Sequence, residues 1–262
     1  MSSHFSFSKY HGTGNDFIMI DDRTCSFNLS TTRIHALCNR RFGIGADGLI
    51  LIRPSDKADF QMVYFNADGG EGSMCGNGAR CASAFAYRIG LGQKEIVFEG
   101  VDGMHTATLL GNDIVKLRMN DVKEFKQRIG FSFVDTGSPH LVIPASDLES
   151  VDVNQVGKKY RHDVEFAPGG TNVNFIEFKD EGLFVRTFER GVEEETLSCG
   201  TGVTAVALVA HRNGWVASDA DFVDIRTRGG DLKVFFKPDP TGGYRDIFLQ
   251  GPAVHVFDGQ FC

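Results

Sequence analysis

Two cysteines occupy matching positions in two copies of a short motif. The chain reads MCGNG at 74–78 and SCGTG at 198–202, so that Cys75 and Cys199 each precede Gly-x-Gly. After each motif come seven residues and then Ala-x-Arg-x-Gly, so the likeness extends beyond the cysteines. A motif repeated in this way predicts two halves of similar structure, each presenting one thiol.

The position of these thiols favours acid–base chemistry. We expect Cys75 and Cys199 to stand at helix N-termini, where the helix dipole favours thiolate and such thiols have pKa values of about 3.5–7.5. The glycines allow close approach to a ligand, and the free N–H groups of a first helical turn can hold a carboxylate. One thiolate could remove an α-proton while the other thiol protonates the opposite face, which inverts a stereocentre. Buried packing residues and a Cys75–Cys199 disulfide are the alternatives.

Loops ahead of the two predicted helices carry groups suited to an amino-acid head group. Asn66 can donate and accept hydrogen bonds, Glu189 can hold an ammonium group, and Arg190 can bind a carboxylate with two N–H groups. A turn-forming asparagine and a solvated ion pair are equally consistent with the spacing alone.

Histidines and an acidic run lie near these loops. His11 and His140 are both expected in glycine-containing loops, where either a structural or a catalytic role is open. The run Glu193-Glu194-Glu195 is interpreted as a solvated loop face.

Composition limits the class of protein. With 262 residues, 42% hydrophobic and 23% charged, the chain is long enough for one large or two ordinary globular domains. The net charge of −7 and the lack of a Lys/Arg run argue against nucleic acid or an anionic membrane as partner. The sequence shows neither a signal peptide nor an apolar run of transmembrane length. Its six cysteines lack zinc-site spacing, so we expect no metal, and reduced thiols in the cytoplasm.

Hydrophobic periodicity predicts an α+β protein. Helices are expected after Ser30, from Cys75 to Gly90, around 154–160, and from Cys199 to Gly214. Strands are expected near 5–9, 49–52, 60–65, 96–98, 105–109, 114–119, 131–134, 172–178, 183–188, 222–227, 232–236, 247–249 and 253–257. These elements predict two pseudo-symmetric domains, 1–124 and 125–250, with the closing segment 251–262 returning to the first.

Eight segments in this order resemble the diaminopimelate epimerases, which are cofactor-independent amino-acid isomerases. They are HGTGNDF at 11–17, GIGADG at 43–48, FNADG at 65–69, MCGNGARC at 74–81, GTNVNF at 170–175, FERG at 188–191, CGTG at 199–202 and GPAVHVF at 251–257. The resemblance covers essentially the whole chain. It implies two similar domains, each a mostly antiparallel barrel-like sheet around a central helix, with the active site in the cleft between them.

The resemblance also assigns roles to residues. Cys75 and Cys199 would be the catalytic pair that converts LL-diaminopimelate to the meso form for lysine and peptidoglycan biosynthesis, with no cofactor. His140 and Glu189 would tune the thiols. The substrate would be bound by Asn15, Asn66, Gly76, Asn77, Asn172, Glu189, Arg190, Gly200 and Thr201.

This chain departs from the family pattern at three places. Gly48 stands where many members have glutamine, and Ser138 stands where an asparagine that binds the distal end of the substrate is expected. The stretch 189–199 is one residue longer than the common pattern. None of these departures involves the thiols, so the reaction type follows more firmly than the exact substrate.

Three other functions are consistent with part of the pattern. A proline or hydroxyproline racemase would favour histidine after the first Cys-Gly, where this chain has Asn77. A redox switch would use both thiols but leave Asn66 and Arg190 unexplained, and a pyridoxal-phosphate isomerase would not need paired thiols. The expected partner is a small molecule, and the sequence leaves a homodimer open.

Overall fold

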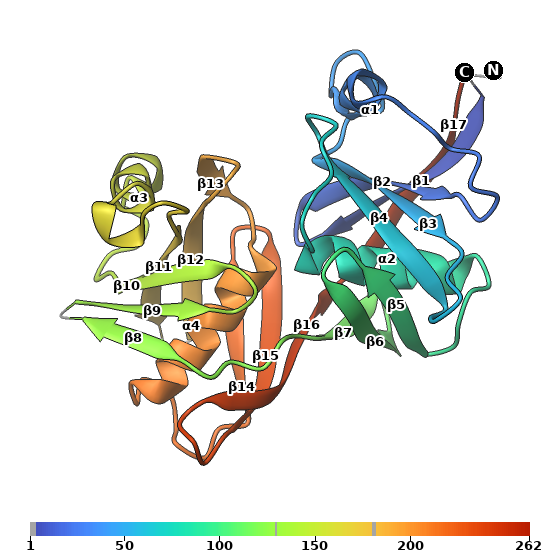
Figure 1. Cartoon of the computed structure of the whole chain (residues 1–262). Helices are drawn as coiled ribbons and strands as arrows, with labels where there is room; N and C mark the ends of the chain where they lie inside the picture. The colour runs from blue at the N-terminus through green and yellow to red at the C-terminus, as the bar shows by residue number, and fades with distance from the viewer. Residues whose placement is uncertain (1–3, 129, 180–181) are drawn as a thin grey trace. The chain divides into compact units, whose positions relative to one another are not determined.

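The computed structural model describes residues 4–128, 130–179 and 182–262, so the first three residues of the N-terminal segment lie outside it. Contacts divide the chain into two units. One comprises Met1–Leu117 with Gly251–Cys262, and the other comprises Arg118–Gln250. Each unit has its own strands and its own long helix, α2 or α4 (Figure 1).

The first unit is a mostly antiparallel sheet with two helices. Its described elements are β1 (Phe5–Gly12), β2 (Asn15–Asp21), α1 (Thr31–Cys38), β3 (Gly48–Arg53), β4 (Phe60–Asn66), α2 (Gly76–Arg88), β5 (Glu95–Gly100), β6 (Gly103–Gly111), β7 (Ile114–Arg118) and β17 (Val254–Phe261). The strands pair in the order β17-β1-β2-β3-β4-β5-β6-β7. The β2–β3 and β4–β5 pairs are parallel and the other pairs are antiparallel.

The second unit repeats this topology. Its described elements are β8 (Phe125–Arg128), β9 (Phe131–Asp135), β10 (Pro139–Pro144), α3 (Val153–Arg161), the 3-10 turn η1 (Val164–Phe166), β11 (Asn172–Lys179), β12 (Gly182–Glu189), β13 (Glu194–Thr196), α4 (Gly200–Arg212), β14 (Phe222–Thr227), β15 (Gly230–Pro238) and β16 (Tyr244–Pro252). The order β8-β9-β10-β11-β12-β14-β15-β16 has parallel pairs at β10–β11 and β12–β14. Parallel and antiparallel pairs thus occur at the same steps in both units, which confirms the predicted α+β repeat.

A buried helix forms the centre of each unit. Helix α2 packs against β1–β6, and helix α4 packs against β9–β12, β14 and β15. The body of each helix is rich in small or branched apolar residues, with Ala79, Ala82 and Ala86 in α2 and the run 205–210 in α4 fully buried. A helix that is apolar on most sides is stable only when surrounded, as these are. Among the described helices, none combines the length and hydropathy required to cross a membrane.

Several predicted helix boundaries are confirmed. Ser30 caps α1 by accepting a hydrogen bond from the N–H of Arg33. Helices α2 and α4 begin directly after Cys75 and Cys199. Gly90 and Gly214, just beyond the ends of these helices, adopt φ values of +83° and +69°, a backbone conformation that favours glycine. The closing strand β17 pairs with β1, as expected.

Other predictions were wrong. Strands β8, β10 and β13 were not expected, because they are short and two of them lie in turn-rich or acidic sequence. His11 lies in β1 and His140 in β10, so neither is in a loop. In place of the loop expected around His11, β1 and β2 form a tight hairpin in which Thr13 and Gly14 lie between the paired strands.

Candidate active site

Cys75 is the residue at which the chain turns into α2. Its φ of −116° and ψ of 118° are extended, and the helix starts at Gly76. The N–H of Gly78 lies 3.5 Å from the Cys75 Sγ, within the first turn. The sulfur therefore lies at the positive end of the helix dipole, where a thiolate is favoured.

Asn15 presents its amide oxygen to this sulfur. The Asn15 Nδ2 donates to the carboxylate of Asp47 at 2.8 Å. Because of this bond, the amide oxygen Oδ1 of Asn15 points away from Asp47. That Oδ1 lies 3.6 Å from the Cys75 Sγ and can accept a hydrogen bond from the thiol. Asp47 is itself paired with Arg40 at 2.7 Å, so a charged anchor fixes the orientation of the amide.

A second ion pair holds the same segment in place. The carboxylate of Asp16 lies 2.7 Å from Lys9 Nζ and 2.6 Å from Arg40. Burial raises the pKa of Asp16, but hydrogen bonds from Arg40 and Lys9 outweigh it and hold this pKa well below its ordinary value. Asp16 therefore stays ionised and ties the β1–β2 hairpin to the loop before β3.

A fully buried arginine lies beneath the start of α2. Arg80 donates to Asn77 Oδ1 at 2.9 Å and to the carbonyl oxygens of Gly76 and Pro252, both at 3.3 Å. Burial lowers the pKa of Arg80 from its ordinary value, and the thiols of Cys81 and Cys75 oppose that shift. The guanidinium group stays protonated in proteins, and the three acceptors around it are neutral. Arg80 therefore keeps a positive charge, which favours a thiolate at Cys75. Arg80 was not singled out from the sequence, although it follows Cys75 inside the predicted helix and could have been noticed for that reason.

Asn77 connects the arginine to the asparagine of the hairpin. Its Nδ2 donates to Asn15 Oδ1 at 3.3 Å, while its own Oδ1 accepts from Arg80. Only 2% of Asn77 is exposed. The side chain of Asn77 thus supports the half-site, and its backbone N–H lies in the first turn of α2.

The second half-site is built on a different set of side chains. Cys199 is the N-cap of α4, with φ −118° and ψ 112°, close to the values at Cys75. Its Sγ lies 3.5 Å from Thr201 Oγ1, which in turn lies 2.9 Å from His140 Nε2. Burial lowers the pKa of His140 to about 3, with a further contribution from the charge of Arg190. His140 is therefore neutral at physiological pH.

Arg190 belongs to a hydrogen-bonded group with Asn172 and Ser138. The Asn172 Oδ1 accepts from the Arg190 N–H at 2.8 Å, and its Nδ2 donates to Ser138 Oγ and to the Pro139 carbonyl, both at 2.9 Å. The guanidinium of Arg190 lies 3.5 Å from Ser138 Oγ. Ser138 and Arg190 both line a cavity of about 600 Å³ in this unit, together with Phe133. The amide of Asn172 thus fixes the backbone at Arg190, whose residue lines a space large enough for a ligand group.

Glu189 ends β12 beside this group. Its carboxylate accepts a hydrogen bond from Thr196 Oγ1 at 3.0 Å. The acidic run that follows is not a solvated loop face, because Glu195 lies in β13 with its carboxylate bound at 2.7 and 2.8 Å by Arg186. Sequence could not reveal this ion pair, since its partner lies on a different strand.

Two predicted positions have simpler surroundings. Asn66 ends β4 and is exposed, with its backbone closing the turn to Gly70. At Gly48 an added Cβ would lie 2.5 Å from the Tyr64 ring and 2.6 Å from the Phe65 carbonyl oxygen. The tyrosine therefore occupies the space that a larger residue at 48 would need.

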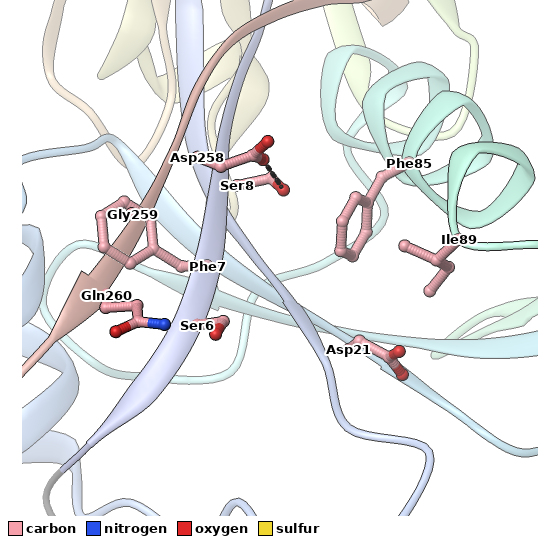
Figure 2. Close-up of a pocket in the computed structure, with 9 residues that line it drawn as sticks. All are labelled: Ser6, Phe7, Ser8, Asp21, Phe85, Ile89, Asp258, Gly259 and Gln260. Atoms are coloured by element: carbon pink, nitrogen blue, oxygen red, sulfur yellow. Dashed lines mark hydrogen bonds between the residues drawn. The ribbon is translucent and has the colours of Figure 1, made fainter.

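A shallow recess in the first unit lies away from these residues. Figure 2 shows it between Phe85 and Ile89 at the C-terminal end of α2 and the edge of β1 and β17, where Ser8 donates to Asp258. Cys75 stands at the opposite end of the same helix. Within the described residues, no three His, Cys, Asp or Glu side chains converge as metal ligands would.

Comparisons with known sequences point to one family. The family model described as diaminopimelate epimerase matches residues 7–123 and 132–256. The diaminopimelate epimerase of Flavobacterium psychrophilum is 45% identical over 252 residues, spanning 95% of this chain and 97% of that protein. The diaminopimelate epimerase of Chlorobaculum tepidum is 45% identical over 256 residues, spanning 95% and 98%.

Solved structures share the fold at low identity. A Bacillus anthracis phenazine biosynthesis protein of the PhzF family has a TM-score of 0.77 at 16% identity and covers 100% of both chains. A hydroxyproline epimerase from Agrobacterium vitis, with bound trans-4-hydroxy-L-proline, has a TM-score of 0.66 at 15% identity and covers 99% of this chain and 93% of that one.

Proposed function

The chain belongs to the diaminopimelate epimerase family, and from this premise we propose that it interconverts LL- and meso-2,6-diaminopimelate without a cofactor. As a member of this family the protein is an isomerase that acts as an amino-acid epimerase. The observation that carries the proposal is the pair of thiols at the starts of two buried helices in topologically equivalent units. The meso product would supply lysine and peptidoglycan biosynthesis.

The proposed reaction uses one sulfur as base and the other as acid. The thiolate takes the proton from one α-carbon, and the electron pair of the broken C–H bond moves onto that carbon and its carboxylate. The second thiol then delivers its proton to the opposite face, so the two cysteines exchange protonation states in each turnover. The helix N-termini at Cys75 and Cys199 support this role, because both lower the cost of holding a thiolate.

The reacting carboxylate would be held by backbone N–H groups. The proposed donors are Gly76 and Asn77 in α2 and Gly200 and Thr201 in α4, with Asn15 close to the first pair. The first N–H groups of a helix have no partner within the helix, so they can donate to an anion. As negative charge moves onto the carboxylate during proton removal, these bonds strengthen, which stabilises the transition state.

The distal amino-acid group is assigned to a second set of residues. We assign its carboxylate to Arg190 and its ammonium to Glu189, with Asn66 as a further contact. The bonds from Asn172 to Arg190 and Ser138 support a positioning role for Asn172. Ser138 stands in place of the expected asparagine and contacts both Asn172 and Arg190. Its shorter side chain leaves more room in the cavity. This set would explain selection of a substrate with two amino-acid ends.

An assay with defined substrates tests the proposal. Purified, dialysed and reduced protein should convert LL-diaminopimelate to the meso form, measured by chiral chromatography with no pyridoxal phosphate added. Cys75→Ala and Cys199→Ala should each abolish the conversion. L-Proline and trans-4-hydroxy-L-proline are the competing substrates, since racemases of this fold act on such compounds. Activity on either of them without activity on diaminopimelate would overturn the proposal.

A further inference from the structure

We propose that Asn174 is a positioning residue that directs a chain of hydrogen bonds through His140 and Thr201, so that the Thr201 hydroxyl donates to the Cys199 sulfur. The inference rests on the proposed function, because it concerns one of the two reacting thiols. Asn174 lies in β11 and is fully buried. Its described hydrogen bonds go to His140, Leu141 and Thr187, and it would act on the sulfur through His140 and Thr201.

The orientation of the Asn174 amide is fixed by its neighbours. Its Nδ2 lies 2.9 Å from the carbonyl oxygen of Leu141, which can only accept. Its Oδ1 lies 3.0 Å from Thr187 Oγ1, which can donate. The second N–H of Nδ2 is therefore free to point at His140 Nδ1, which lies 3.2 Å away.

This contact selects one tautomer of the imidazole. A ring nitrogen that faces an N–H donor must be the unprotonated one, so Nδ1 of His140 accepts and the proton resides on Nε2. Burial lowers the pKa of His140 to about 3, which keeps the ring neutral. The Nε2–H then donates to Thr201 Oγ1 at 2.9 Å.

The last group in this chain of hydrogen bonds is the Thr201 hydroxyl. Because Thr201 Oγ1 accepts from His140, its own hydrogen points at the other polar neighbour described for it, the Cys199 Sγ at 3.5 Å. A hydrogen bond donated to a sulfur favours the charged form, so this chain lowers the pKa of the Cys199 thiol. Charged groups at the ends of the adjacent strands are Glu189 at the end of β12, Arg190 directly after it, and Asp135 at the end of β9. The Asp135 carboxylate accepts from the Gly137 N–H.

The first half-site has the opposite polarity at this position. There the anchored amide of Asn15 presents an oxygen, an acceptor, to the Cys75 Sγ. A change at Asn174 should therefore alter Cys199 alone, and Cys75 in the same sample serves as the internal reference.

The pH dependence of thiol alkylation tests the proposal without any substrate. Wild type and variants are treated briefly with iodoacetamide from pH 5 to 10, and labelling of each cysteine is measured by peptide mass spectrometry. Asn174→Leu and Thr201→Val should each raise the apparent pKa of Cys199 by about one unit, which slows its alkylation about tenfold below that pKa. The Cys75 profile should not move.

Two further variants separate hydrogen bonding from packing. Thr201→Ser keeps the hydroxyl and should restore the wild-type profile of Cys199. Thr204→Val is the matched control, because Thr204 is a buried threonine of the same helix whose hydroxyl donates to the Gly200 carbonyl at 2.9 Å. It should leave Cys199 unchanged. An unshifted Cys199 profile in Thr201→Val, or an equal shift in Thr204→Val, would overturn the proposal.

The readout is independent of the proposed function. Failure of wild type to epimerise diaminopimelate, together with the predicted shifts, would reject the assigned reaction and keep the hydrogen-bond chain. Normal epimerisation with no shift in Thr201→Val would reject the chain and keep the reaction.

Discussion

The neutral, buried His140 makes the stability of the second unit depend on pH. In the folded protein the pKa of His140 is about 3, whereas an unfolded histidine titrates near about 6.5. Below about pH 6.5 the unfolded chain binds a proton at His140, whereas the folded chain does not. The stability from the neutral ring is thus fully present above that pH, and it is lost as the pH falls toward the folded pKa.

The size of this loss follows from the shift. Well below pH 6.5, linkage removes about 1.4 kcal/mol per pH unit from the free energy of unfolding. Between pH 7 and pH 5 the predicted loss from His140 alone is about 2 kcal/mol. His140→Gln cannot titrate, so wild type should lose about 2 kcal/mol more than this variant over the same interval.

Urea unfolding followed by tryptophan fluorescence measures the difference. Trp215 is the only tryptophan in the sequence, and it packs against Phe178 with ring centroids 5.3 Å apart in the unit that contains His140. Its emission therefore reports on unfolding of the relevant unit. Parallel changes in the unfolding free energy of wild type and His140→Gln from pH 7 to pH 5 would refute the assignment of a neutral, buried ring.

Three other predictions follow from particular contacts. Gly202→Ala would place a Cβ 2.5 Å from Asn174 Oδ1, so unfolding by urea should show a loss of about 1–3 kcal/mol, and an unchanged midpoint would contradict this packing. Arg190→Gln should lower kcat/KM for diaminopimelate about 10- to 100-fold, because a charged hydrogen bond to the distal carboxylate is lost; equal kinetics would remove Arg190 from the site. Arg80→Met removes the buried cation near Cys75, so iodoacetamide titration should show a higher apparent pKa for Cys75, and an unaltered titration would argue against this electrostatic role.

Local patterns were sufficient to predict the central helices. The Cys-Gly-x-Gly starts and the glycines Gly90 and Gly214 specify both ends of α2 and α4, because capping and positive φ depend on neighbouring residues. The repeat also predicted the shared topology. These signals lie within a few residues of the feature they determine.

Features that depend on distant partners were missed. Strand β10 follows Gly137 and begins at Pro139, so the sequence favours a turn, and its strand character comes from pairing with β9 and β11. The burial of Arg80 and the ion pair of Glu195 depend likewise on residues far along the chain. Asn174 follows Asn172 at strand spacing, a signal that could have placed both amides on one side of β11.

The two-thiol mechanism is tested most directly by the origin of the hydrogen on the product. Reduced wild-type protein is incubated with LL-diaminopimelate in deuterium oxide, and the reaction is stopped at low conversion. The two isomers are then separated, and the mass of each is measured by mass spectrometry. Because Cys75 and Cys199 exchange their thiol protons with solvent, the meso product should carry one deuterium at the inverted carbon while the remaining LL substrate keeps its hydrogen. A meso product that retains the original hydrogen would contradict the use of two separate thiols.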